Sequence, residues 1–202
     1  SPDGLDHAGL EEAAARSVAD DAPVLLLGTS AAFIHWLDAL AARGRRLALP
    51  DGSRLMDTGG FKGRGRSVAP AELRAAYAER LGLPADRCVN EYGMTEMLSQ
   101  LYDEVLRDPG PRPSPADPRP KASPSWVRSL AVDPETLEPL PAGRTGLLRH
   151  VDLANFASVP AIQTEDLGRV DERGRVLLEG RVTGAPPRGC SIAMDLLLGG
   201  AG

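Results

Sequence analysis

The sequence contains few cysteines and no long apolar run. The two cysteines, Cys88 and Cys190, are too few for a disulfide framework and are typical of a reducing compartment, so we expect a cytoplasmic protein. No apolar stretch approaches the roughly 20 residues of a membrane-spanning helix. The first residues, which do not include an initiator Met, also lack the basic and apolar segments of a signal peptide. The sequence therefore predicts neither a secreted disulfide scaffold nor a membrane span.

Basic residues are outnumbered, and two common kinds of site are missing. With 23 Lys and Arg against 28 Asp and Glu, the formal net charge is −5, which argues against an extended nucleic-acid interface. No Gly-Lys-Ser/Thr follows the glycine-rich stretch Gly59–Arg66 at the spacing of a P-loop. His7, His35 and His150 show no metal-ligand spacing, and we expect all three on helix surfaces or in loops. At 202 residues and 42% hydrophobic composition, the chain is expected to be a soluble, globular, bacterial protein.

Hydrophobic patterning in the first half predicts alternating strands and helices. Apolar side chains recur at helical spacing in three segments, residues 5–18, 31–43 and 71–81. Short runs of strand type occur at residues 23–27, 54–58 and 87–90. The first of these runs is continuously apolar, which is typical of a buried strand. Because strands alternate with helices, we expect an α/β fold with a parallel sheet and ligand-binding loops at the carboxyl ends of its strands.

The character of the sequence changes after Asp108. Residues 109–124 are rich in proline and polar side chains, which predicts a loop without regular structure. Further strands are expected at residues 126–132, 145–151 and 176–178, and the turn Asp171–Gly174 indicates a β-hairpin. We therefore expect four segments: an α/β part (1–108), the loop (109–124), a smaller β-rich part (125–180) and a short tail (181–202).

The most informative segment is Val89–Glu96, in which a predicted strand leads into a Tyr-Gly turn. Tyr92 offers an aromatic face to a purine base, and Gly93 lets the backbone pass close beneath it. Thr95 can donate a hydrogen bond to a phosphate, and Glu96 can hold Mg²⁺. The structural alternative is the start of a helix, with Thr95 as its cap and Glu96 favoured by the helix dipole.

Two other segments carry groups that suit a nucleotide. Gly59, Gly60 and Phe61 follow a predicted strand, and glycines at such a place allow the backbone to approach a ligand closely. The same composition is also typical of an ordinary surface loop. Asp166, within Gln163–Arg169, can accept two hydrogen bonds from ribose hydroxyls, or it can hold a turn by accepting from backbone N–H groups.

The order and spacing of these segments resemble the adenylate-forming superfamily, whose members activate a carboxylic acid with ATP to make an acyl-AMP. The shared pattern is a Gly-Gly strand end, Tyr-Gly-x-Thr-Glu, then Thr-x-Asp-Leu-Gly-Arg and Gly-Arg. The resemblance implies the fold of the C-terminal part of the large domain of these enzymes. It also implies that Gly59, Gly60 and Phe61 line the adenine pocket, with Tyr92 stacked on the base above Gly93.

The same resemblance assigns the remaining site residues. Thr95 would contact the α-phosphate, and Glu96 would hold Mg²⁺. Asp166 would bind the ribose, and Arg181 would lie at the inter-domain hinge of the superfamily. ATP and Mg²⁺ are therefore the expected cofactors, and a carboxylic acid, fatty or aromatic, is the expected substrate.

Within the superfamily, the chain is most similar to the acyl-protein synthetases of bacterial bioluminescence operons. Three segments carry this similarity: Met56–Arg64, Asn90–Glu96 and Arg188–Asp195. Those enzymes activate a fatty acid and pass the acyl group to a cysteine near their own C-terminus, from which it continues to a reductase. The resemblance therefore implies an acyl-acceptor protein or a reductase as a partner.

Cys190 stands at the place of that acceptor cysteine. A thiolate attacks a mixed anhydride well, and Arg188 close by in sequence would favour the thiolate. The alternative for Cys190 is a small apolar residue packed in a strand. We expect Cys88, in an apolar strand, to be structural.

Two features of the superfamily have no match in this sequence. One is the phosphate loop rich in Ser, Thr and Gly, and the other is a C-terminal domain with a catalytic lysine. The acyl-protein synthetase branch lacks the second feature, but not the first. We therefore expect a C-terminal fragment, a chain completed by a partner, or a degenerate protein, with weak or absent adenylation on its own. The alternative function is a nucleotide-binding or scaffolding module without turnover.

Overall fold

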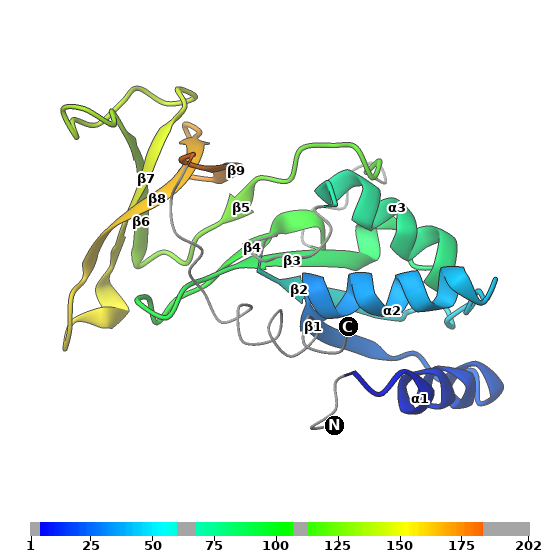
Figure 1. Ribbon diagram of the computed structural model, residues 1–202. Coiled ribbons are helices and arrows are strands. Elements are labelled where there is room, and N and C mark those ends of the chain that lie inside the picture. Colours follow the sequence, from blue (N-terminus) through cyan, green and yellow to red (C-terminus); the bar gives the residue numbers. More distant parts are fainter. Residues whose placement is uncertain (1–4, 60–67, 107–112, 184–202) are drawn as a thin grey trace. The chain divides into compact units, whose positions relative to one another are not determined.

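The fold is that of a computed structural model, which describes residues 5–59, 68–106 and 113–183 (Figure 1). Two compact units draw their described residues from Ser1–Asn90 with Val105–Asp117, and from Glu91–Glu104 with Pro118–Pro187. Composition changes near Asp108, whereas contacts group Glu91–Glu104 with the later strands. The Tyr-Gly turn and Asp166 therefore belong to the same unit. Among the described residues, no helix is both long enough and apolar enough to cross a membrane.

The first unit combines helices with parallel strands. Its elements are α1 (His7–Ala19), β1 (Leu25–Thr29), α2 (Ser30–Ala42), β2 (Arg54–Thr58), α3 (Pro70–Leu81) and the start of β3 (Cys88–Tyr92). The three helices and three strands expected in this half of the chain are all confirmed, and β2 has the bounds expected for it. β1 and β2 pair in parallel, with Leu25 opposite Arg54, and β3 is next in the strand order.

Local sequence explains where the helices begin and end. The Asp6 carboxylate accepts a hydrogen bond from the Gly9 N–H at 2.9 Å, which caps α1. Thr29 Oγ1 accepts from the Ala32 N–H at 3.2 Å and caps α2 in the same way. α3 ends at Gly82, whose φ of 71° lies in the left-handed region that glycine adopts without strain.

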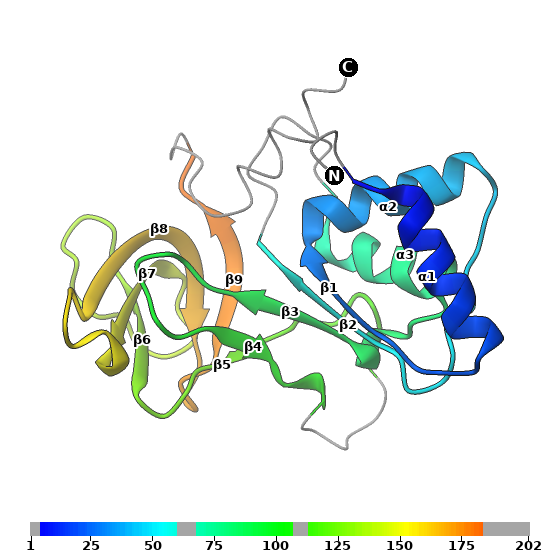
Figure 2. The same ribbon diagram turned by 90° about the horizontal axis from the view of Figure 1, so that it is seen from below.

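α2 and α3 lie side by side over β1 and β2, and the core of the unit lies between these layers (Figures 1 and 2). Its largest fully buried side chains are Trp36, Tyr77, Leu40, Leu55 and Leu81. Burying each such side chain stabilises the fold by about 1.5–3 kcal/mol. The expectation that β1 is a buried strand is wrong, because β1 is the terminal strand of the order and its Leu25 and Leu27 are each 61% exposed.

A buried polar cluster ties the carboxyl end of β2 to its neighbours. Asp57 is 5% exposed and accepts a hydrogen bond from the Tyr77 hydroxyl at 2.7 Å. The Asn90 side-chain amide donates to the other carboxylate oxygen at 2.6 Å. Burial, with the nearby Asp57 charge, raises the pKa of Tyr77, so its hydroxyl stays protonated and keeps donating. The cluster fixes α3 and β3 against the strand end that Gly59 follows.

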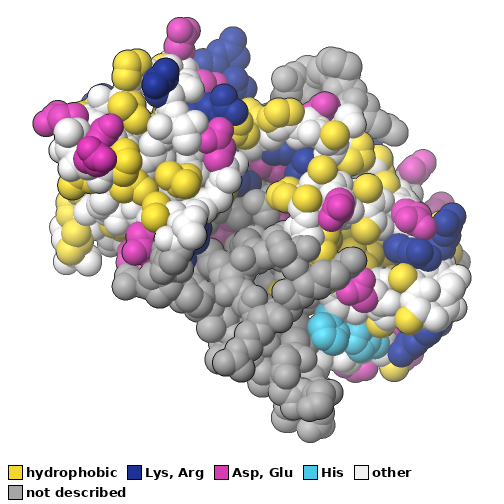
Figure 3. Space-filling model, turned by 45° about the horizontal axis from the view of Figure 1, so that its top comes forward, with side chains coloured by type: hydrophobic (Ala, Val, Ile, Leu, Met, Phe, Trp, Pro, Cys, Tyr) yellow, Lys and Arg dark blue, Asp and Glu magenta, His cyan; other side chains and the backbone are white. Residues whose placement is uncertain are grey.

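Two of the three histidines lie on helices of this unit, where side chains of this type gather at one place on the surface (Figure 3). His35 is exposed on α2 and His7 is the first residue of α1, with the two ring centroids 6.0 Å apart. For these two residues the expected helix positions are confirmed.

The second unit is built from antiparallel strands. They are the end of β3, β4 (Leu101–Asp103), β5 (Lys121–Ala122), β6 (Val127–Val132), β7 (Gly146–Asp152), β8 (Ala161–Val170) and β9 (Val176–Arg181). Their order is β3-β4-β5-β9-β8-β7-β6, and neighbouring strands in this order pair antiparallel. A short 3₁₀ turn occurs in this unit at Leu153–Asn155; another, Ala85–Arg87, belongs to the first unit, and a third, Glu104–Leu106, spans the boundary in sequence.

Most of these strands were expected from the sequence. The three strands predicted after residue 125 and the hairpin turn at Asp171–Gly174 are confirmed by β6, β7, β9 and the β8–β9 pair. In the turn, Asp171 accepts hydrogen bonds from the backbone of Arg173 and Arg175, and Gly174 has a φ of 77°. β4 and β5 were not predicted, and β8 was implied only as the first strand of the hairpin. β4 and β5 are too short to show a pattern, and β5 lies inside the segment expected to be an irregular loop.

The core of this unit holds Leu101, Leu148, Val176, Met97 and Val127. A buried ion pair lies between β4 and β5, where Lys121 is directly opposite Asp103. The Lys121 Nζ lies 2.9 Å from Asp103 Oδ1, and the side chains are 4% and 1% exposed. On β8, a Cβ at Gly168 would lie 2.6 Å from the Leu177 carbonyl oxygen, so this strand contact requires glycine.

Candidate active site

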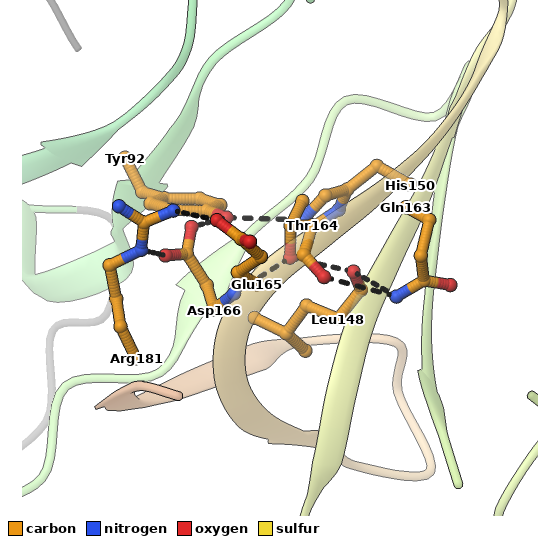
Figure 4. Close-up of polar contacts among 8 residues, drawn as sticks. All are labelled: Tyr92, Leu148, His150, Gln163, Thr164, Glu165, Asp166 and Arg181. Carbon is orange, nitrogen blue, oxygen red and sulfur yellow. Dashed lines mark hydrogen bonds and ion pairs between the residues drawn. The ribbon is translucent and has the colours of Figure 1, made fainter. Parts of the chain in front are cut away.

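The carboxylate of Asp166 is the centre of the candidate site (Figure 4). Asp166 lies on β8 and is 8% exposed. The Tyr92 hydroxyl donates to its Oδ2 at 2.7 Å, and Arg181 Nε forms an ion pair with its Oδ1 at 2.9 Å. Strand register explains the second contact, because Asp166 and Arg181 are directly opposite each other on β8 and β9. Three residues predicted for the site are thus brought together.

Arg181 also pairs with the neighbouring carboxylate. Its Nη2 lies 3.1 Å from Glu165 Oε2, so one guanidinium contacts two consecutive acidic residues (Figure 4). Adjacent residues of a regular strand point to opposite faces. Here the β8–β9 register shifts between Leu167 and Gly168, and such a bulge locally increases the twist of the strand. This irregularity follows directly after the two acidic residues.

Behind Tyr92 lies His150, whose predicted position is wrong. His150 was expected on a helix surface or in a loop, but it lies on β7 and is 0% exposed. Its Nε2 is 3.4 Å from the Tyr92 hydroxyl, and its Nδ1 is 2.9 Å from Ser129 Oγ. The physical reason is the alternation of β7, in which Leu148, His150 and Asp152 all point inward. The same period of two in the sequence was the signal that could have placed it.

Burial determines the protonation states of His150 and Tyr92. Removal from water lowers the pKa of His150 to about 4, although the Asp166 charge acts in the opposite direction. Burial, followed by the Asp166 charge and hydrogen bond, raises the pKa of Tyr92. At neutral pH the imidazole is therefore uncharged and the phenol keeps its proton.

The pH dependence of folding stability tests the state of His150. Its folded-state pKa is about 4, below the unfolded value of about 6.5. The unfolded chain therefore binds more protons in this interval, and stability is lost as pH falls from about 6.5 towards 4. We expect His150 to account for about 3 kcal/mol of that loss, measured by urea unfolding at a series of pH values. If the free energy of unfolding of the wild type and of a His150→Leu variant changed with pH in parallel, the expected contribution of His150 would be contradicted.

Thr95 and Glu96 lie on an exposed turn after β3. The Met97 N–H donates to the Met94 carbonyl at 3.1 Å, and Thr95 Oγ1 donates to Glu96 Oε2 at 3.1 Å. No helix begins within residues 93–100, all of which the structure describes, so the helix-start alternative is wrong. The turn presents a hydroxyl and a carboxylate side by side on the surface of the second unit.

Two residues outside the sequence motifs, Asp152 and Asn155, hold this turn. Asp152, at the end of β7, is 0% exposed. Its Oδ2 accepts from the Leu98 and Ser99 backbone N–H groups at 3.1 and 2.9 Å. The Asn155 amide donates to the Glu96 carbonyl oxygen at 2.8 Å. Neither residue belongs to a motif, so only the tertiary structure reveals this role.

The remaining predicted residues lie elsewhere. Gly93 follows Tyr92 at the start of the turn. Gly59 directly follows β2 in the first unit and has a φ of 86°, and its carbonyl oxygen accepts from Ser30 Oγ at 3.1 Å. Gly60, Phe61 and Cys190 lie outside the described residues. Cys88 is buried on β3, which agrees with a structural role.

The sequence is similar to those of known proteins. A family model described as "Acyl-protein synthetase, LuxE" matches residues 8–198. The long-chain-fatty-acid–luciferin-component ligase of Vibrio harveyi is 38% identical over 79 residues, which are 36% of this chain and 21% of that protein. The Aliivibrio fischeri protein of the same name is 44% identical over 52 residues, 26% and 14% of the two chains. The matched part is therefore about a fifth or less of each relative.

Solved structures share the fold. ATP-bound MatB from Rhodopseudomonas palustris has a TM-score of 0.54 at 20% identity, covering 88% of this chain and 33% of that one. The luciferase-like enzyme of the mealworm Zophobas morio has a TM-score of 0.52 at 16% identity, covering 78% and 38%. At such identities the likeness concerns the fold alone, which is the α/β fold of adenylate-forming enzymes. Because the family model spans nearly the whole sequence, this chain belongs to the LuxE acyl-protein synthetase family.

Proposed function

We propose that this protein activates a carboxylic acid, fatty or aromatic, with ATP to form an acyl-AMP and then passes the acyl group to a thiol. The observation that carries the proposal is the buried Asp166 carboxylate, fixed between the Tyr92 hydroxyl and the Arg181 guanidinium in a member of the acyl-protein synthetase family. Two further facts support it. Both curated relatives are named fatty-acid ligases, and the related MatB structure holds ATP.

Asp166 is suited to bind the ribose of the nucleotide. A carboxylate offers about four acceptor positions, and two of them face Tyr92 and Arg181. Acceptor capacity therefore remains for ribose hydroxyls. Hydrogen bonds to a carboxylate are charge-assisted and are about twice as strong as those between neutral groups. Tyr92 would offer its ring to the adenine.

Thr95 and Glu96 suit the phosphate end. The exposed hydroxyl of Thr95 would donate to the α-phosphate, and the carboxylate beside it would hold Mg²⁺. Within the described residues, no group of three or more His, Cys, Asp or Glu side chains could hold a metal. A single carboxylate is nevertheless a common protein contribution where phosphates and water supply the other ligands. When bound, the ion would neutralise charge on the phosphates.

The proposed chemistry has two displacements. A carboxylate oxygen of the acid attacks the α-phosphorus of ATP, and the bond from that phosphorus to the pyrophosphate oxygen breaks. A thiolate then attacks the acyl carbon, and the bond from that carbon to the AMP oxygen breaks. Cys190 is the proposed thiol, supported by its place in the family's sequence pattern. An acyl-acceptor protein or a reductase is the proposed destination of the acyl group.

Calorimetric titration with a non-hydrolysable acyl-AMP analogue tests the nucleotide site. We expect binding by the wild type, and about 10- to 100-fold weaker binding by Asp166→Asn, because hydrogen bonds to a charged acceptor are lost. Asp171→Asn is the matched control, since it perturbs the turn of the same hairpin but leaves Asp166 intact. Equal affinity of wild type and Asp166→Asn would contradict the assignment. Analogue binding without ATP–pyrophosphate exchange would instead favour a nucleotide-binding module without turnover.

Acyl transfer has a separate test. Incubation with ATP and a labelled fatty or aryl acid is expected to label the wild-type protein in a form that hydroxylamine cleaves. Cys190→Ser should lose this label completely, whereas Cys88→Ser, which changes the buried cysteine, should keep it. A labelled Cys190→Ser protein would exclude Cys190 as the acceptor. Comparison of palmitate with an aryl acid would define the substrate class.

A further inference from the structure

Four polar side chains, those of Ser129, His150, Tyr92 and Asp166, form one continuous hydrogen-bonded chain inside the second unit. Ser129 on β6 lies 2.9 Å from His150 Nδ1, and His150 Nε2 lies 3.4 Å from the Tyr92 hydroxyl. That hydroxyl donates to Asp166 Oδ2 at 2.7 Å. Ser129 is 5% and His150 0% exposed, so water does not compete for these groups. Part of this chain is drawn in Figure 4.

Every hydrogen bond in this hydrogen-bonded chain can run in the same direction, with each group donating to the next one towards Asp166. Asp166 faces Arg181 as a carboxylate, so the Tyr92 hydroxyl donates to it and can only accept from the other side. That requires the proton of the neutral imidazole to be on His150 Nε2. His150 Nδ1 is then a bare acceptor, and Ser129 Oγ–H is the group that donates to it. One tautomer thus satisfies every member of the chain.

The opposite tautomer would disrupt the site. With the proton on Nδ1, the bare Nε2 would compete with Asp166 for the hydrogen of Tyr92. A hydroxyl turned towards His150 would present its lone pairs to Asp166, and two acceptors would then face each other at 2.7 Å. Unpaired polar groups at such buried positions are costly, so the Asp166 carboxylate favours the tautomer in which His150 Nε2–H donates to Tyr92, and the Ser129 hydroxyl satisfies the bare Nδ1 of that tautomer.

We propose that Ser129 and His150 are positioning residues for ribose recognition: they orient the Tyr92 hydroxyl, which holds the Asp166 carboxylate in place for the sugar. The inference rests on the proposed nucleotide site and deepens it. Neither residue touches the ligand. Their effect passes through Tyr92 and concerns the part of the nucleotide that Asp166 contacts.

Deoxynucleotides separate this role from simple packing. We would measure the affinities of AMP, 2′-deoxy-AMP and 3′-deoxy-AMP by calorimetry. The wild type should prefer AMP to at least one deoxy analogue by about tenfold, the worth of one good hydrogen bond. His150→Leu should reduce that preference to about twofold or less. His150→Gln, whose side-chain amide can still donate to Tyr92, should restore most of it.

A purely structural role predicts a different result. Substitution would then weaken the binding of AMP and of the deoxy analogues equally. The ratio of their affinities would stay unchanged, and that result would overturn the proposal. Ser129→Ala tests the same point with a smaller change, in case His150→Leu does not fold. It should also lower the preference, and an unchanged ratio would again overturn the proposal. A wild type that does not bind AMP would overturn the proposed function, and this inference with it.

Discussion

Replacing Lys121 with Met is expected to destabilise the second unit by about 3–5 kcal/mol. The Lys121 ammonium lies 2.9 Å from the Asp103 carboxylate, and both side chains are almost completely buried. The substitution leaves a carboxylate in the protein interior without this partner, and its lost hydration is no longer offset. Urea unfolding followed by circular dichroism would measure the change.

The double variant Asp103→Leu/Lys121→Met is the control. Because it removes both charges, it should be more stable than either single variant by about 2 kcal/mol or more. A loss in the double variant equal to the sum of the two single losses would show that the two residues act independently. It would also refute the importance of the ion pair.

Asp152→Ala is expected to lower the free energy of unfolding by a similar amount, about 3–5 kcal/mol. The carboxylate accepts from the backbone N–H groups of Leu98 and Ser99, and from the Ser99 hydroxyl and the Ala154 N–H at 3.0 Å each. All four donors would lose their acceptor at a position that is 0% exposed. The same unfolding experiment would report the loss.

The control for Asp152 is Asp133→Ala. Asp133 also accepts from two backbone N–H groups, those of Glu135 and Thr136, but on an exposed turn where water can replace it. Its substitution should change stability much less. Comparable losses in the two variants would contradict the importance of burial. Asp152→Ala should also loosen the turn that carries Thr95 and Glu96, visible as faster amide exchange there.

Much of the fold could be predicted because local physics determines it. Helices begin at capping residues such as Asp6 and Thr29, and strands follow the period of two or a short apolar run. The exposure of Leu25 and Leu27 could not be predicted, because it depends on the place of β1 in the strand order. β4 and β5 were missed because three and two residues carry too little pattern.

The candidate site, like the fold, could be predicted only in part from the sequence. Tyr92, Asp166 and Arg181 were named from motifs, and their direct contact is a result of strand pairing between distant parts of the chain. His150 and Asp152 were missed because a single polar residue at an inward strand position resembles any other until its partners are known. Their importance comes from burial and from hydrogen bonds to groups that lie far away in sequence.

Each unit contains one of the two tryptophans of the chain. Trp36 is 1% exposed in the core of the first unit, whereas Trp126 is 51% exposed in the second, with its indole N–H bound to Ser99 Oγ at 2.9 Å. Intrinsic fluorescence therefore has two separate sources: a blue-shifted emitter that reddens when the first unit melts, and a half-solvated one that reports on the second. Variants with a single tryptophan would reveal whether the halves melt in one coincident transition or in succession.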